Sequence, residues 1–202
     1  MKEPLLLLPT RLELEAVIGG TGNRGYTVGI GPAAAAMMSY HWASQEKPSM
    51  VVLLGVAGAY EGRGLKPGDV VCGLSDCFAD LGYWEGGVPQ TLEDMALPML
   101  QTGDEEWGTR FDLQPIWDLP ALPMITVSSM STSHERAAAN QLKFGAATES
   151  MEGAAVAMVC RFLDLPFAQV RAVSNMVGPR ERSSWKMQEA LLQLRNLVER
   201  HL

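Results

Sequence analysis

Residues 150–175 read SMEGAAVAMVCRFLDLPFAQVRAVSN and determine the class of fold. Met151–Leu163 is apolar nearly all round, which predicts a helix that other elements cover on most sides. Phe167–Val173 is rich in apolar and β-branched residues, which is typical of a strand in the core. A buried helix followed closely by a buried strand indicates an α/β protein.

The same alternation of strand and helix continues toward both ends of the chain. The other expected strands are Leu5–Leu8, Tyr26–Ile30, Met50–Leu54, Asp69–Gly73 and Met124–Val127, and the other expected helices are Pro32–Ser44, Glu135–Lys143 and Trp185–His201. This order predicts a three-layer α/β/α fold around a mostly parallel or mixed central sheet. The 202 residues contain no internal repeat or linker, so we expect one domain spanning 1–202.

The segment between Ala79 and Pro123 interrupts this pattern. It contains several glycines and prolines together with Trp84, Trp107 and Trp117. A long irregular segment in a compact domain is either a lid over a binding site or a solvated surface excursion, and the sequence favours neither. The apolar part from Phe78 to Trp84 is a candidate contact between subunits.

Composition and charge exclude several classes of protein. The net charge is −7 and Lys or Arg never occur in a run longer than a pair, which argues against a nucleic-acid partner. The apolar run at Leu5–Leu8 is too short for a signal peptide or a membrane span, so we expect no membrane association. Cys72, Cys77 and Cys160 have no metal-binding spacing and predict reduced thiols in the cytoplasm.

Motifs for common cofactors and nucleophiles are weak or absent. Gly29-Ile30-Gly31-Pro32-Ala33-Ala34 fits a loose dinucleotide-binding pattern, but no acidic residue follows at the required distance, which favours a tight strand-to-helix turn. His41, His134 and His201 lack metal-ligand spacing, and the chain has no G-x-S-x-G elbow. The sequence therefore predicts neither a metal nor a cofactor.

Polar and small residues do gather where expected strands end. Gly55–Ala59 directly follows a buried strand, and its small residues, Ala57 and Gly58 among them, would let a ligand approach the backbone of a turn. Glu152 lies at the mouth of an apolar helix, where a charge is costly unless a partner uses it. Ser174 and Asn175 end a strand at the same edge of the sheet. These groups are predicted to meet in one crevice.

Together these motifs resemble the nucleoside phosphorylase/nucleosidase superfamily. The matching stretches are Gly29–Ala35, Gly55–Gly58, Leu65–Val71, Met151–Ala155 and Arg171–Asn175. The layout is similar to methylthioadenosine/S-adenosylhomocysteine nucleosidases. The details look more like futalosine hydrolases, on the residues Pro9–Glu13, Phe78–Gly82 and Ser174–Arg180 running on to Trp185.

The resemblance implies a purine nucleoside as substrate and a role for each matched residue. Glu13 would activate the attacking water, with Glu15 as the alternative base. Glu152 would accept hydrogen bonds from the ribose hydroxyls, and Met151 would pack beside the sugar. Asn175 would contact the purine at N7 and at its six-position substituent. Base stacking would fall to Trp185, to Met130 or to a residue of the segment 79–123.

Asn175 itself indicates which purine leaves. The adenine-type nucleosidases carry Asp at this position, which can protonate N7 and accept from a six-amino group. An Asn amide instead donates to N7 and to a six-oxo group, so hypoxanthine or guanine fits better than adenine. This favours futalosine over methylthioadenosine as the substrate.

Alternatives remain at the level of reaction type. A six-oxopurine nucleoside phosphorylase would need cations to hold phosphate, and Arg11 and Arg24 are the candidates. A methylthioadenosine/S-adenosylhomocysteine nucleosidase and a non-catalytic nucleoside-binding protein are further alternatives. Arg171, inside a strand, either orients nearby carboxylates or is purely structural. The resemblance also implies a homodimer or larger homo-oligomer.

Overall fold

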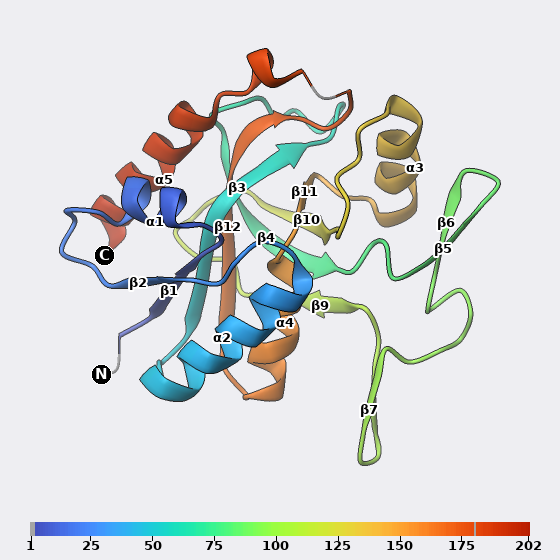
Figure 1. Ribbon diagram of the computed structural model, residues 1–202, viewed down its shortest axis with the longest axis horizontal. Helices are drawn as coiled ribbons and strands as arrows, with labels where there is room; N and C mark the ends of the chain where they lie inside the picture. Colours follow the sequence, from blue (N-terminus) through green and yellow to red (C-terminus); the bar gives the residue numbers. More distant parts are fainter. Residues whose placement is uncertain (1–2, 180) are drawn as a thin grey trace.

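A computed structural model describes residues 3–179 and 181–202 of the chain, and its centre is a mixed eight-stranded sheet (Figure 1). The strands are β1 (Leu5–Leu8), β2 (Gly25–Thr27), β3 (Val51–Ala59), β4 (Val70–Cys77), β9 (Arg110–Asp112), β10 (Ala121–Thr126), β11 (Thr148–Ser150) and β12 (Phe167–Met176). They are ordered β11-β10-β4-β12-β3-β1-β2, with β9 paired to β4. The prediction of an α/β fold with a mixed sheet is confirmed.

The sheet curls back on itself, which an alternation of strands and helices does not predict. The short strand β11 pairs in parallel with β10 and antiparallel with β3. Strands β3, β12, β4, β10 and β11 therefore form a closed ring. This closure brings the residues around β11 against the carboxyl end of β3, beside the carboxyl end of β12.

Helices cover both faces of the sheet. The helices α2 (Pro32–Glu46) and α4 (Gly153–Phe162) pack on one face over Leu53, and α1 (Arg11–Val17) and α5 (Met187–His201) pack on the other over Leu54 (Figure 1). The helix α3 (His134–Phe144) packs against the end of β10. Because alternate residues of β3 point to opposite faces, its unbroken apolar run can bury both sides.

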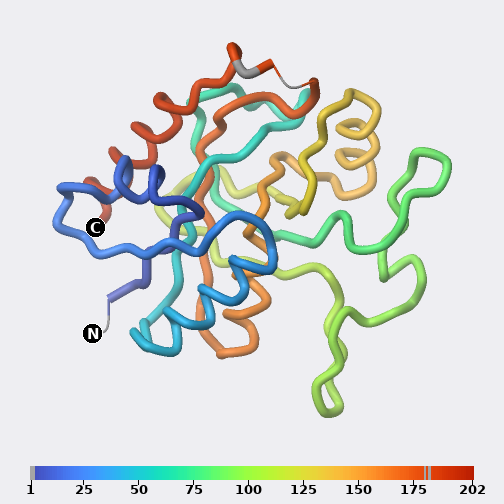
Figure 2. The backbone as a smooth tube through the Cα atoms, in the orientation of Figure 1, coloured from blue at the N-terminus to red at the C-terminus, as the bar shows by residue number. Residues whose placement is uncertain are grey.

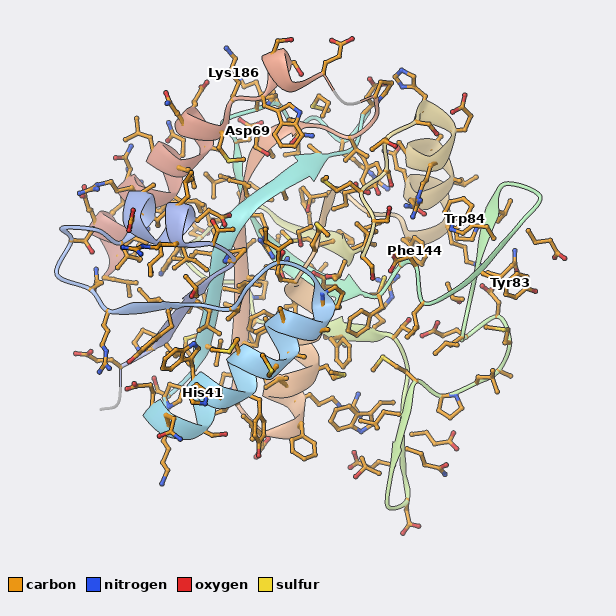
Figure 3. All side chains as sticks on the ribbon, in the orientation of Figure 1. His41, Asp69, Tyr83, Trp84, Phe144 and Lys186 are labelled. Atoms are coloured by element: carbon orange, nitrogen blue, oxygen red, sulfur yellow. The ribbon has the colours of Figure 1, made fainter. Side chains whose placement is uncertain are left out.

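The segment between β4 and β10 contains two hairpins that extend away from the sheet (Figures 1 and 2). The first pairs β5 (Gly82–Glu85) with β6 (Val88–Thr91), and the second pairs β7 (Leu100–Thr102) with β8 (Glu105–Trp107). Trp84 stacks against Arg136 of α3, whereas Tyr83 is half exposed on the outer side of the hairpin (Figure 3). The segment is therefore more regular than predicted. Gly82–Trp84 lies in the first hairpin, and Leu81 directly precedes it.

Several predicted boundaries are wrong in an informative way. Gly55–Ala59, expected as a turn after a strand, is the second half of β3 itself, because β11 and β12 both pair with it. The helix expected from Trp185 begins at Met187, after the 3-10 turn Arg182–Ser184. The interpretation of Gly29–Ala34 as a strand-to-helix turn fits the left-handed φ angles of 84° at Gly29 and 87° at Gly31.

One buried acid in the sheet has no charged partner in direct contact within the described residues. Asp76 of β4 is fully buried, and its Oδ1 accepts a 2.9 Å hydrogen bond from Thr126. Its Oδ2 and the Gln169 Oε1 lack partners in the described structure, and a Cβ on Gly153 would lie 2.0 Å from each. Burial raises the pKa of Asp76 to about 7. A protonated Asp76 can donate to the Gln169 oxygen, which would give both atoms a partner.

Asp76→Asn should therefore change how stability depends on pH. The unfolded acid ionises near pH 3.8 but the folded one only near pH 7, so folding loses about 4 kcal/mol as the pH rises between these values. A neutral Asn of the same shape removes this loss. We expect urea unfolding at pH 4.5 and pH 8 to show the variant gaining stability relative to wild type at the higher pH. The exposed Asp112→Asn variant should show no such gain, and an unchanged pH dependence in Asp76→Asn would contradict the assignment.

Candidate active site

A cavity of about 400 Å³ opens along the carboxyl-terminal halves of β3 and β12. All of the predicted site residues line it: Glu13, Ala57, Gly58, Met151, Glu152, Ser174, Asn175 and Trp185. They come from five separate parts of the chain, which the closed sheet brings together. The structure thus supports the prediction of a single crevice, while the chemical role of each residue remains a prediction.

Glu13 lies at the start of α1, where the sequence Thr10-Arg11-Leu12-Glu13 forms a capping box. Its Oε2 accepts hydrogen bonds from the Thr10 amide at 3.0 Å and the Thr10 hydroxyl at 2.6 Å. Its Oε1 accepts from the Val56 amide at 3.2 Å. The side chain is buried, and this burial raises its pKa above the usual value of 4.5. A carboxylate accepts about four hydrogen bonds, so one position on Oε1 remains for a water.

Glu15, the alternative base, lies away from the cavity. Its side chain is 64% exposed and pairs at 2.7 Å with Arg11 on the outer surface of α1. Arg24, the other candidate phosphate ligand, pairs with Glu46 and stacks over Tyr26. None of these three residues lines the cavity. The geometry therefore favours Glu13 as the base and removes Arg11 and Arg24 as phosphate ligands.

Glu152 precedes α4 and is held by an ion pair. Its Oε2 accepts from Arg171 Nη2 at 3.2 Å, and both side chains are almost completely buried. Two amides complete the contacts, from Met151 at 3.3 Å to Oε2 and from Gly31 at 3.4 Å to Oε1. The Gly29–Ala34 turn thus contributes a donor to the carboxylate. Arg171 orients Glu152, as one of the two sequence interpretations proposed.

The amide of Asn175 has a defined orientation. Its Nδ2 donates to the Met176 carbonyl at 2.9 Å, and a carbonyl can only accept, so this atom must be nitrogen. Its Oδ1 accepts from the Ser174 hydroxyl at 2.8 Å. The second hydrogen on Nδ2 has no partner among the described residues and remains available to a ligand. Asn175 therefore offers the cavity a donor.

Gly55 and Gly58 of β3 both lie against neighbouring side chains. A Cβ on Gly55 would lie 2.5 Å from Arg171 Nη1 and 3.2 Å from Glu13 Oε1. A Cβ on Gly58 would lie 2.9 Å from Val177 and 3.4 Å from Asn175 Nδ2. Ala57 and Gly58 line the cavity and Gly55 does not, so the prediction that small residues let a ligand approach the backbone applies to Ala57 and Gly58 alone.

The candidates for base stacking are reduced to two. Trp185 and Met130 line the cavity, but no described residue of the segment 79–123 does. The Lys186 amide donates to the Ser174 carbonyl at 2.8 Å, which joins the turn that carries Trp185 to β12 (Figure 3 labels Lys186). Of the three alternatives for base stacking, the one in segment 79–123 therefore has no support among the described residues of a single chain. Arg180, part of the motif after Asn175, lies outside the described residues.

Sequence reasoning missed three contributors to the site. Thr10 and Gly31 supply donors to Glu13 and Glu152. The T-x-x-E pattern at residues 10–13 could have predicted the first. Glu149 is a third buried carboxylate in the cavity wall. It stands in a short strand with no periodic pattern, so the sequence offers no indication of its position.

Other kinds of site receive no support from the part of the chain that is described. No group of three or more His, Cys, Asp and Glu there could hold a metal ion. None of the described helices is long and apolar enough to cross a membrane. Cys72, Cys77 and Cys160 are free and buried.

Comparison with known proteins agrees with this architecture. The model of the family described as "Phosphorylase superfamily" matches residues 11–202. A futalosine hydrolase from Thermus thermophilus is 34% identical, covering 98% of this chain and 94% of its own. A 5'-methylthioadenosine/S-adenosylhomocysteine nucleosidase from Bacillus cereus is 28% identical, covering 98% and 93%. The solved futalosine hydrolase of Helicobacter pylori superposes with a TM-score of 0.78 at 16% identity, covering 98% of both chains.

The chain belongs to the phosphorylase superfamily and, within it, to the futalosine hydrolase family. The solved structure, at its low identity, supports the fold alone.

Proposed function

We propose that this protein hydrolyses the N-glycosidic bond of futalosine, releasing hypoxanthine and dehypoxanthine futalosine in menaquinone biosynthesis. The observation that carries the proposal is the amide of Asn175, which lines the cavity and has one Nδ2 hydrogen without a partner among the described residues. A donor beside N7 and the six position meets two acceptors in hypoxanthine, whereas in adenine the six-amino group is itself a donor and leaves only N7. Relatives named futalosine hydrolase support the same substrate.

The geometry suggests how the reaction proceeds. Glu13 takes a proton from a water as the water oxygen bonds to the anomeric carbon of the ribose. The electron pair of the glycosidic bond passes to the purine, whose developing charge is stabilised by the Asn175 donor. The base takes up one proton from solvent, which balances the proton that Glu13 later returns to solvent. Glu152, fixed by Arg171, accepts from the ribose hydroxyls and holds the sugar in place.

Hydrolysis is favoured over phosphorolysis by the composition of the cavity wall. Phosphate binding in proteins relies on Arg, Lys or clustered amides. Among the described lining residues there is no Lys or Arg, and Arg171 is buried behind Glu152. Water is therefore the nucleophile that the described site can hold.

The proposal is tested by incubating the purified protein with futalosine, inosine and methylthioadenosine, each with and without phosphate. We expect free hypoxanthine from futalosine in phosphate-free buffer, measured by liquid chromatography. A strict requirement for phosphate would contradict the hydrolase assignment. Release of adenine alone would contradict the interpretation of Asn175.

The assembly and compartment of the protein are part of the same proposal. The half-exposed apolar side chains of Leu81, Tyr83 and Trp84 support a homodimer or larger assembly through the first hairpin. The three free cysteines support a reducing cytoplasm. Neither a nucleic acid nor a membrane is proposed as a partner.

A further inference from the structure

Three buried carboxylates in the cavity share one pattern of hydrogen bonds. Glu13, Glu149 and Glu152 each accept three hydrogen bonds from described residues, two on Oε2 and one on Oε1. Because a carboxylate has about four acceptor positions, each retains one on Oε1. The proposed reaction uses this position on Glu13 for water and on Glu152 for ribose. It assigns nothing to Glu149.

Glu149 is held as firmly as the other two. Its Oε2 accepts from the Tyr60 hydroxyl at 2.6 Å and the Ser131 hydroxyl at 2.7 Å, and its Oε1 accepts from the Ser131 amide at 2.8 Å. Burial, followed by the adjacent carboxylate, raises the pKa of Tyr60, so the phenol stays a donor. Asn140 in turn donates to the Ser131 hydroxyl at 3.0 Å, which fixes that hydroxyl as a donor to Glu149.

No cation explains the burial of this carboxylate. Glu149 is only 6% exposed, and it appears in none of the ion pairs among the described residues. A buried carboxylate without a cation is costly unless its remaining acceptor position finds a donor. Because Glu149 lines the cavity, that donor can belong to a ligand.

The strand register places Glu149 opposite Asn175. Gly58 of β3 pairs with Glu149 of β11 on one side and with Asn175 of β12 on the other. Directly paired residues point to the same face, and neighbouring strands lie about 4.8 Å apart, so the two side chains flank the glycine across about 10 Å. A Cβ on Gly58 would lie 2.9 Å from Val177 and 3.4 Å from Asn175 Nδ2, so the glycine leaves room for these two side chains. This end of the cavity thus presents a donor on one side and an acceptor on the other.

The other two carboxylates lie near the middle of the same strand, Glu13 directly and Glu152 through its partner Arg171. Glu13 and Arg171 lie against Gly55 and Val56, three residues before Gly58, which corresponds to about 10 Å along a strand. Glu149 is therefore near the position proposed for the purine, and the ribose lies toward Glu152.

We propose that Glu149 accepts a hydrogen bond from N1–H of a six-oxopurine while Asn175 donates to the purine on its other side. This inference rests on the proposed function and specifies how the same site selects its base. Hypoxanthine has a donor at N1 beside an acceptor at position six, which complements this pair of side chains. Adenine has an acceptor at N1 and a donor at position six, so the Glu149 contact would be mismatched and Asn175 would keep only N7 as an acceptor. Guanine shares the hypoxanthine pattern along this edge.

The test is the affinity of the free bases, measured by titration calorimetry without turnover. The wild-type protein should bind hypoxanthine roughly tenfold or more tightly than adenine and than 6-methoxypurine, which lacks the N1 hydrogen. In Glu149→Gln the amide oxygen takes the place of Oε2, which accepts from the Tyr60 and Ser131 hydroxyls, and the nitrogen faces N1, so the preference for hypoxanthine over adenine should fall roughly tenfold or more. Glu13→Gln makes the same chemical change at the other end of the cavity and should keep the preference.

The results separate this inference from the proposed function. An unchanged base preference in a folded Glu149→Gln protein that still hydrolyses futalosine would overturn the role of Glu149 alone. A preference that depends on Glu149, in a protein that releases no hypoxanthine, would support the inference while the proposed reaction fails. If the variant does not fold, equal binding of hypoxanthine and 6-methoxypurine by the wild-type protein would overturn the inference.

Discussion

Glu13→Gln should lower the turnover number roughly 10²- to 10⁴-fold, the range typical for loss of a general base, while nucleoside binding is nearly unchanged. The amide has almost the shape of the carboxylate and can still accept from Thr10, but it cannot take a proton from water. Single-turnover kinetics with futalosine measure the chemical step, and equilibrium titration of the same variant measures binding. A loss in the chemical step alone would place Glu13 at the reacting water.

The matched control is Glu15→Gln, two residues along the same helix. Glu15 is exposed and paired with Arg11 on the far side of α1, so this variant should turn over as the wild type does. Full activity in Glu13→Gln, combined with a loss in Glu15→Gln, would reverse the assignment. Thermal unfolding of both variants shows whether either change acts through the capping box of α1.

Arg171→Met should destabilise the fold by about 3–5 kcal/mol, because it leaves the Glu152 carboxylate buried without its cation. The guanidinium passes beneath Gly55 and contacts the Val56 carbonyl at 3.4 Å, so no water can readily replace it. Urea unfolding at pH 7 gives the free energy directly. Arg11→Met, which breaks an exposed ion pair, should cost less than about 1 kcal/mol.

A double variant distinguishes a lost ion pair from a packing defect. If the cost of Arg171→Met comes from an unpaired charge, then adding Glu152→Gln removes that charge and should recover part of the stability. If the double variant is less stable by the sum of both single losses, the two side chains contribute independently and the ion-pair explanation fails. Activity is not the readout here, since both residues belong to the site.

The local pattern of the sequence was sufficient for most of the central elements. Leu5–Leu8 has the predicted bounds, and the buried helix and strand around residues 150–175 lie where their apolar runs indicate. Glu152 and Asn175 were recognisable because a polar group at the end of an apolar element has to find a partner. These inferences depend on neighbours in sequence, which periodicity describes well.

The features that the sequence pattern did not predict depend on contacts between residues that are distant in sequence. Gly55–Ala59 has the composition of a turn, yet it is a strand because β11 and β12 satisfy its backbone on both sides. The strand β11 has only three residues, which is too short for a hydrophobic periodicity to be recognised. The position of Glu149 could therefore not be predicted from the sequence pattern. The closure of the sheet brings Glu149 to the wall of the cavity, and closure is a tertiary property.

The carboxylates of Glu13, Glu149 and Glu152 also give the cavity a charge of its own. Arg171 is the one cation in contact with any of them in the described structure, so the ionised carboxylates give the cavity a net negative field, and their burial strengthens it. Such a field repels a phosphate dianion but not a neutral water molecule, and it weakens little with added salt because the charges are buried. The electrostatic field of the cavity would then select water over phosphate as the nucleophile at the binding step, before any bond is broken.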